Sequence, residues 1–176
     1  MDLLDLLIVR HAIAVEHVDW KGGPDSERPL TDKGRALMKR NAAGLARAFP
    51  RLDLIATSPF VRAAQTAEIV KDAYGRVGIE EVSALASGGE RSEVVAWLRN
   101  RRQQADLAEP AAHIALVGHE PDLGQLVSWL VSGQAHVPFE MRKGGACLLR
   151  FSEPPGAGRA TLRWFASPSL LRKLAH

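Results

Sequence analysis

Short apolar runs alternate along the chain with longer amphipathic stretches, and this alternation predicts strands separated by helices. The run Leu6–Val9 stands directly before the polar pair Arg10-His11. It is too short for a helix and is typical of a buried strand. Further runs of this kind lie at 52–56, 79–82, 113–118, 146–151 and 161–165. The last two flank a turn-like segment at 154–156 and predict a strand pair.

The stretches between these runs carry apolar residues at helical spacing. Thr31 is a suitable N-cap for a helix that Pro50 ends, and its apolar positions fall on one face. Those positions are Met38, Ala42, Leu45 and Phe49. Two more helices are predicted, one over 94–102 and one that opens at Pro121.

The segment after the second strand predicts another helix, over residues 60–74. Ser58 is a suitable N-cap, Pro59 suits the first helical position, and Gly75 ends the helix. The start of this helix therefore lies immediately after the carboxyl end of a predicted strand.

This order of elements predicts one α/β domain over residues 1–176, a three-layer fold whose mostly parallel sheet has helices on both faces. Ligands of such sheets bind beyond the carboxyl ends of the strands. At these ends, three predicted strands carry residues that can bind a ligand or take part in catalysis. They are Arg10-His11, Ser58-Pro59 with Arg62 shortly after, and Gly118-His119. We therefore expect these groups to meet at one edge of the sheet.

Composition and charge narrow the class of protein. Of the 176 residues, 46% are hydrophobic and 24% are charged, which is ordinary globular usage and excludes wholesale disorder. The net charge of +3 comes from scattered arginines and favours an acidic ligand only weakly. Cys147 is the single cysteine, which excludes an internal disulfide and fits a reducing cytosol. We expect a cytoplasmic protein.

Several kinds of partner are not expected. No apolar run approaches the roughly 18–20 residues of a membrane span, and acidic residues stand where a secretion signal carries cations. The spacing of His17 and His113 matches no metal motif, so no metal is expected. The basic run 99–102 lacks interleaved aromatics, so no nucleic acid is expected either.

The expected cluster of two imidazoles and two guanidiniums suits a phosphoryl group. Transfer of a phosphoryl group is catalysed mainly by positive charge placed around its oxygens, and the arginine fork donates two parallel hydrogen bonds to such oxygens. His11, held at the end of a buried strand, is the better candidate for a nucleophile. His119 would face it and, when protonated, donate to a phosphate oxygen.

The residues of this cluster stand in recognisable motifs. Arg10-His11-Ala12 resembles the Arg-His-Gly signature of the histidine phosphatase superfamily, also called the phosphoglycerate mutase-like family. The resemblance spans about residues 6 to 131 through Leu30-Thr31-x-x-Gly34, Ser58-Pro59-x-x-Arg62-Ala63-x-Gln65-Thr66 and Gly118-His119. The short chain and the segment Ser26-x-Arg28-Pro29-Leu30-Thr31 are most similar to the SixA-type phosphohistidine phosphatases, the smallest branch.

The resemblance implies a phosphoglycerate mutase-like fold and a phosphatase reaction. It implies that His11 becomes phosphorylated on a ring nitrogen, that Arg10, Arg62 and His119 hold the phosphate, and that water hydrolyses the phosphohistidine. It implies no metal and no organic cofactor. The favoured substrate is phosphohistidine on a protein, as in signal transduction.

Two positions depart from the family pattern. Ala12 replaces the signature glycine, and a positive φ there would strain it by about 1–2 kcal/mol, whereas a negative φ would only narrow the approach to the site. SixA-like branches lack the obvious acid of larger members. Glu90 is the nearest positional candidate for an acid/base, with a solvated first-turn acid as the alternative. Arg28 is a candidate substrate contact, with a solvated loop as the alternative.

Two other functions remain open from the sequence. One is a broad small-molecule phosphomonoesterase, and the other is a catalytically idle phospho-ligand binding or regulatory module. A mutase is disfavoured because mutases of this family carry insertions that enclose the intermediate. The presence of all four charged site groups argues against the idle module.

Overall fold

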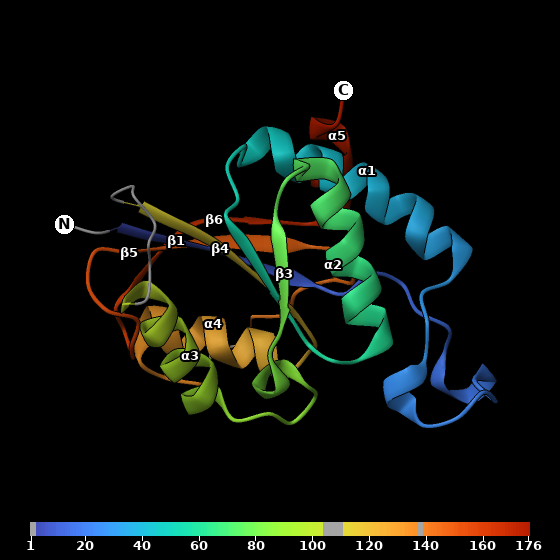
Figure 1. Ribbon diagram of the computed structural model, residues 1–176, viewed down its shortest axis with the longest axis horizontal. Coiled ribbons are helices and arrows are strands. Elements are labelled where there is room, and N and C mark those ends of the chain that lie inside the picture. The colour runs from blue at the N-terminus through green and yellow to red at the C-terminus, as the bar shows by residue number, and fades with distance from the viewer. Residues whose placement is uncertain (1–2, 104–110, 137–138) are drawn as a thin grey trace.

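A six-stranded sheet forms the centre of the molecule (Figure 1). The computed structural model describes residues 3–103, 111–136 and 139–176. In spatial order the strands run β3-β2-β4-β1-β5-β6. Their bounds are β1 Leu3–Arg10, β2 Leu54–Thr57, β3 Gly78–Glu81, β4 Ala111–Gly118, β5 Ala146–Phe151 and β6 Ala160–Ala166.

The sheet is parallel on one side of β1 and antiparallel on the other. β1 pairs with β4, β4 with β2 and β2 with β3, all in parallel. β5 pairs antiparallel with both β1 and β6, as predicted for the final strand pair. The carboxyl ends of β1, β2 and β4 therefore lie along one edge of the sheet.

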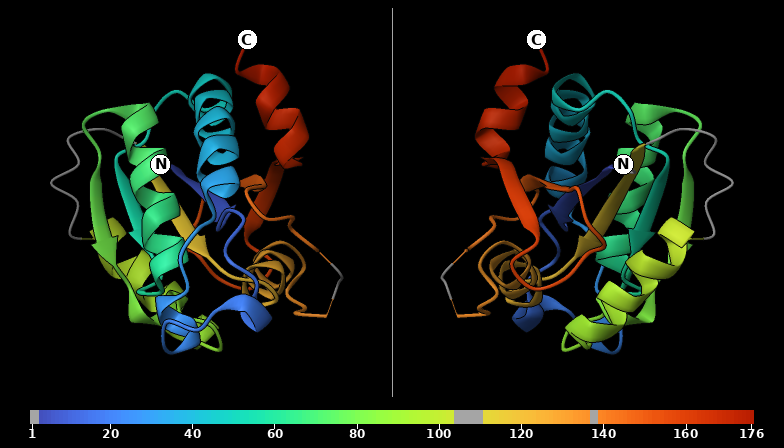
Figure 2. Two further views of the ribbon diagram at one scale, coloured as in Figure 1. Left: turned by 90° about the vertical axis from the view of Figure 1, so that its right-hand side faces the viewer. Right: turned by 90° about the vertical axis from the view of Figure 1, so that its left-hand side faces the viewer.

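Helices cover both faces of the sheet. α1, α2 and α5 lie on one side, and α3 and α4 lie on the other (Figure 2). The predicted three-layer α/β fold is confirmed. The bounds are α1 Asp32–Ala48, α2 Val61–Tyr74, α3 Arg91–Gln103, α4 Asp122–Ser132 and α5 Pro168–Leu174.

The uniformly apolar sequence of β1 reflects its place between two cores. Leu7 and Val9 pack into the core under α1 and α2, while Leu6 and Ile8 pack into the core over α3 and α4. A strand buried on both faces needs apolar residues at every position, and not at alternate ones. β1 is consequently held rigidly as far as its last residues.

The start of α2 differs from the prediction. The helix begins at Val61, and its N-cap is Phe60, which makes no side-chain capping bond. The prediction that Ser58 caps this helix was wrong, because the chain bends at Pro59 and Phe60 before it becomes helical. The Ser58 hydroxyl instead accepts a hydrogen bond from the backbone N–H of Phe60 at 3.2 Å and contacts His119 at 2.7 Å.

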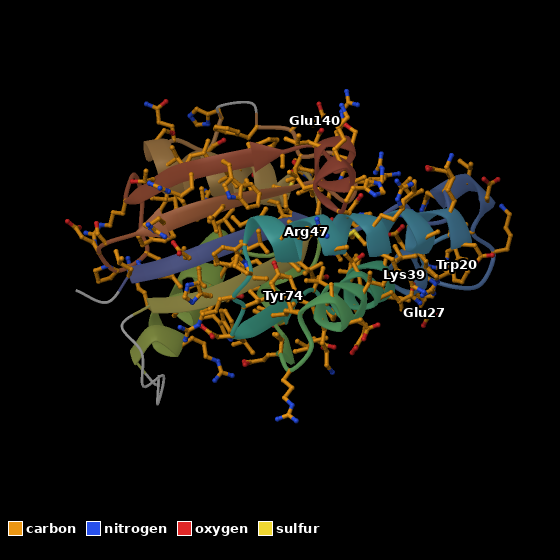
Figure 3. All side chains as sticks on the ribbon, turned by 90° about the horizontal axis from the view of Figure 1, so that it is seen from above. Trp20, Glu27, Lys39, Arg47, Tyr74 and Glu140 are labelled. Atoms are coloured by element: carbon orange, nitrogen blue, oxygen red, sulfur yellow. The ribbon has the colours of Figure 1, made fainter. Side chains whose placement is uncertain are left out.

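An irregular excursion connects β1 to α1. It contains two short 3₁₀ helices, η1 (His17–Asp19) and η2 (Asp25–Glu27), and an isolated bridge between Ala14 and Leu30 closes its base. The excursion lies at the lower right of Figure 1, and η2 packs against α2. Trp20 and Glu27 mark it at one end of the molecule in Figure 3.

Among the helices that the structure describes, none has the length and apolar character needed to cross a bilayer.

Candidate active site

The two histidines of the predicted cluster lie side by side. Arg10 and Gly118 are register partners at the ends of β1 and β4, and the backbone N–H of His11 donates to the Gly118 carbonyl at 3.0 Å. His11 and His119 are thus the first residues beyond two paired strands. Their ring centroids are 5.1 Å apart, and the residues are only 5% and 3% exposed.

The His11 ring is oriented for attack by Nε2. Nδ1 lies 2.7 Å from the Ala12 carbonyl oxygen, which can only accept, so Nδ1 carries the hydrogen and Nε2 carries the lone pair. Burial lowers the pKa of His11 to about 3. The Ala12 carbonyl opposes this shift, and the neighbouring His119, Arg62 and Arg10 reinforce it. His11 is therefore a neutral, nucleophilic imidazole at neutral pH.

Arg62 stands in the first turn of α2 and is 4% exposed. Its Nη1 donates to the Asp25 carbonyl at 2.8 Å and its Nη2 to the Asp25 carboxylate at 2.9 Å. The guanidinium carbon lies 5.0 Å from the centroid of the Phe60 ring. These contacts hold the guanidinium in place between the excursion and α2.

Arg10 is held from the opposite side of the site. Its Nη1 donates to the Met141 carbonyl at 2.7 Å, and the backbone N–H of Met141 donates to Glu120 at 3.3 Å. Burial raises the pKa of Glu120, although the Met141 N–H and the charge of Arg10 oppose the shift. Glu120 thus anchors the segment that positions Arg10.

His119 is neutral at neutral pH in this structure. Burial and the charge of Arg62 lower its pKa to about 4, and Asp25 opposes the shift only in part. Donation to a phosphate oxygen by a protonated His119, the case considered from the sequence, would therefore need its pKa to rise. A phosphate group next to both rings would raise both pKa values, because an anion favours the charged form of an imidazole.

Two arginines and one histidine of the site each have a buried side-chain nitrogen that makes no hydrogen bond. Among the described residues, the buried side-chain N and O atoms that lack a hydrogen bond are four: Arg10 Nε, Arg62 Nε, His119 Nδ1 and the Tyr74 hydroxyl. Buried polar atoms are almost always paired, so each exception calls for an explanation. Three of these four atoms belong to the predicted phosphate-binding residues.

Ala12 fits its position without backbone strain. No described residue other than glycine has a positive φ, so the strained case considered for Ala12 does not arise. Its backbone N–H donates to the Thr66 hydroxyl at 3.0 Å, and that hydroxyl donates to the Arg62 carbonyl at 2.7 Å. Thr66 therefore ties the segment after His11 to the helix that carries Arg62.

Arg28 joins the site through Asp25, a residue that the sequence analysis missed. Arg28 Nε donates to the Asp25 carboxylate at 2.9 Å, and Nη1 donates to the Val15 carbonyl at 2.6 Å. Burial alone would raise the pKa of Asp25. Hydrogen bonds from Arg28, Arg62 and His17 outweigh this effect and hold the pKa at about 2. The only available signal was an acidic residue directly before the Ser26–Thr31 motif.

Glu90 does not line the small cavity beside His119, although its neighbours Gly89 and Arg91 do. It is exposed, precedes the first turn of α3, and its carbonyl accepts from Glu93 and Val94. With Trp129 and Arg99 it lines a surface pocket whose lining does not include His119.

A small cavity of about 40 Å³ opens beside His119. Its walls are mainly apolar, with Leu85 and Leu123 among them, and Arg91 and Asp122 also line it. Asp122 additionally accepts the backbone N–H of Gly88 at 2.8 Å, which ties the loop before α3 to the start of α4.

Across residues 3–103, 111–136 and 139–176, no three His, Cys, Asp or Glu side chains gather in an arrangement that would hold a metal ion.

Comparisons with known proteins show which family the chain is similar to. Residues 6–90 match the sequence profile of the Histidine phosphatase superfamily (branch 1). An uncharacterized protein of Picosynechococcus is 35% identical over 147 residues, 84% of this chain and 85% of its own length. The phosphohistidine phosphatase SixA of Escherichia coli K12 is 29% identical over 170 residues, 96% and 97% of the two chains.

Solved structures extend the comparison to the fold. The protein histidine phosphatase SixA complexed with tungstate superposes with a TM-score of 0.79 at 26% identity, covering 94% of this chain and 97% of that one. Phosphoglycerate mutase from Bacillus anthracis shares the fold, with a TM-score of 0.67 at 12% identity over 99% and 98% of the chains. The predicted phosphoglycerate mutase-like architecture is confirmed.

Proposed function

Because the chain belongs to the histidine phosphatase superfamily, we propose that it is a phosphatase whose covalent intermediate is a phosphohistidine on His11 and whose substrate is phosphohistidine on a protein. A phosphorylated relay protein in the cytoplasm is the partner that this proposal implies.

The reaction has two displacement steps. The lone pair of His11 Nε2 attacks phosphorus, the bond from phosphorus to the substrate imidazole breaks, and that imidazole takes a proton from water, which leaves hydroxide. The hydroxide then attacks the phosphorus on His11, which releases inorganic phosphate and restores the neutral ring. Arg10, Arg62 and His119 hold the phosphoryl oxygens in both steps.

The observation that carries this proposal is the set of unpaired buried nitrogens around His11. Arg10 Nε, Arg62 Nε and His119 Nδ1 have no partner among the described residues, although each is buried. A tetrahedral oxyanion would satisfy such donors. Tungstate, which SixA binds in its solved structure, is an anion of this shape.

The acids near the site favour a phosphohistidine substrate. Asp25, held near a pKa of about 2 by its arginine partners, stays ionised and cannot donate a proton at neutral pH. An imidazole leaving group depends less on a strong proton donor than an alkoxide does, so this arrangement suits a phosphorus–nitrogen bond better than an ester.

The decisive experiment combines rapid quench with a substrate panel. The wild-type protein is mixed with chemically phosphorylated histidine proteins and, separately, with an aryl phosphate. We expect faster turnover of phosphohistidine and an acid-labile, base-stable label on His11. His11→Ala should lose activity by a factor of about 10³ or more.

The exposed His136 supplies a matched control, since His136→Ala removes an exposed imidazole in place of a buried one. A label on a serine or a carboxylate would contradict the proposed nucleophile. Faster turnover of the aryl phosphate would favour the phosphomonoesterase, and tight phosphate binding without turnover of either substrate would favour the idle module.

A further inference from the structure

The Ser58 hydroxyl lies at the carboxyl end of β2, fully buried, between the backbone and the second histidine. The backbone N–H of Ser58 donates to the Val117 carbonyl at 2.9 Å, so the residue is fixed to the end of β4. Its Oγ lies 3.2 Å from the backbone nitrogen of Phe60 and 2.7 Å from His119 Nε2. With 0% exposure, the hydroxyl has no access to solvent.

The direction of these two hydrogen bonds follows from what each group can donate. The backbone N–H of Phe60 can only donate, so the Ser58 oxygen accepts from it. The hydroxyl hydrogen then needs an acceptor, and His119 Nε2 is the acceptor within reach among the described residues. If Nε2 itself carried a hydrogen, a buried hydroxyl hydrogen would be left unpaired, which is costly.

We propose that Ser58 is a positioning residue: its hydroxyl donates to Nε2 of His119 and thereby fixes the tautomer whose hydrogen is on Nδ1. The buried and unpartnered Nδ1–H then serves as a donor for a phosphoryl oxygen. Phe60, whose ring centroid is 4.9 Å from that of His119, restricts rotation of the ring.

The consequence for the site is that His119 needs no extra proton in order to bind a phosphoryl group. A neutral imidazole has one N–H donor, and the wrong tautomer would turn a lone pair toward the anion. Ser58 selects the useful tautomer in advance, so the donor is already directed when the phosphoryl group arrives. This role rests on the proposed function for its purpose, but the tautomer itself is a property of the protein alone.

The first test measures the tautomer without any substrate. In protein with ¹⁵N-labelled histidine, long-range proton–nitrogen spectra at neutral pH show which ring nitrogen carries hydrogen, and His119→Asn assigns the signals. We expect a protonated Nδ1 and an unprotonated Nε2 in the wild type. Ser58→Ala should shift the population toward Nε2–H, the form that free imidazole side chains prefer.

The second test measures the affinity for inorganic phosphate by calorimetry. Ser58→Ala should weaken binding by about tenfold to a hundredfold, the loss expected for one hydrogen bond to a charged group. Thr57→Val is the matched control: it removes the neighbouring buried hydroxyl, which donates to the Ser58 carbonyl at 3.1 Å and does not contact His119. This control should leave both the tautomer and the phosphate affinity unchanged.

The outcomes separate this inference from the proposed function. A wild-type ring with hydrogen on Nε2, or an equal loss of affinity in both variants, would overturn the role of Ser58 while leaving His11 as the nucleophile. The expected tautomer and affinities in a protein that turns over no phosphorylated substrate would support Ser58 and overturn the phosphatase. Because the tautomer is read in the wild type, this outcome does not depend on whether Ser58→Ala folds.

Discussion

The two ends of β1 place charged side chains in opposite circumstances. At the amino end, Asp5 is 3% exposed, and its carboxylate accepts from Arg150 Nε at 2.7 Å and Nη2 at 2.8 Å. His113, the register partner of Asp5 on β4, bonds Asp53 through both its backbone N–H and its ring. At the carboxyl end, Arg10 and His119 keep buried nitrogens without partners.

This contrast distinguishes charges that hold the fold from charges that serve a ligand. At the amino end opposite charges satisfy one another, so the cluster gains nothing from an added ion. At the carboxyl end the cations are fixed by backbone carbonyls, by Phe60 and by Asp25, which leaves other donors free. Unpaired buried donors of this kind lower the free energy of unfolding, and binding of an anion would raise it again.

The largest effect should come from removing a cation at the carboxyl end. Arg62→Met should lower kcat/KM for a phosphohistidine protein by about 10²–10³, the usual loss for one donor that stabilises developing charge. The free energy of unfolding should change little. Arg40→Met, an exposed substitution on α1, is the control, and an Arg62→Met enzyme that kept full activity would contradict the assignment.

The converse substitution at the amino end should affect stability and spare activity. Arg150→Met leaves the buried Asp5 carboxylate without its main partner, so urea denaturation should show a loss of about 1–3 kcal/mol in the free energy of unfolding. Turnover should be unaffected. Adding Asp5→Leu should restore the free energy of unfolding, because the ion pair is then replaced by apolar side chains. A loss of turnover in Arg150→Met would show that the amino end also serves the reaction.

Acid should destabilise the protein through the site histidines. The folded pKa values, about 3 for His11 and about 4 for His119, lie below the ordinary value of 6.5. Between the folded and unfolded values the unfolded chain binds more protons, so stability falls as the pH drops below about 6.5. Each histidine adds a slope of up to about 1.4 kcal/mol per pH unit. His119→Asn should flatten the slope measured by urea denaturation, and equal slopes would contradict the shift.

Asp25→Asn should separate positioning from charge. The carboxylate orients Arg62, but it also repels a phosphoryl anion. We expect kcat to fall by about tenfold, as one charge-assisted hydrogen bond weakens, while KM does not rise. Steady-state kinetics on a phosphohistidine protein measure both constants, and a rise in KM at constant kcat would show that Asp25 has no positioning role.

The smallest effect is expected at Glu90. Glu90→Gln should change kcat by no more than about twofold on both a phosphohistidine peptide and an aryl phosphate, because the side chain is exposed and lines a different pocket from His119. A general acid contributes about 10²–10⁴. A loss in that range on either substrate would identify Glu90 as the proton donor.

The sequence sufficed wherever burial left a periodic signal. The apolar runs of β1 and β4 predicted buried strands, and because parallel strands end at one edge, the meeting of His11 and His119 followed from the alternation of elements. The terminal helix α5 was missed, since its seven residues carry too little periodicity.

Contacts between irregular segments could not be predicted in this way. Asp25 meets Arg62 across 37 positions, and Ser58 meets His119 across 61. Asp25 lies in the excursion, which follows no helical or strand period. The local preference of serine for helix caps gave the wrong role for Ser58. Such hydrogen bonds depend on where the folded chain places two loops, and single-residue propensities do not encode that.

The pairing at the end of β1 also affects how the protein is made. The backbone N–H of Arg10 donates to the Gly145 carbonyl, and that of His11 donates to the Gly118 carbonyl, so His11 is fixed by segments that the ribosome synthesises much later. A nascent chain that has emerged only as far as α3 already contains His11 but lacks both of these partners. The arrangement of the candidate site should therefore form abruptly, near the end of translation, when β5 docks against β1.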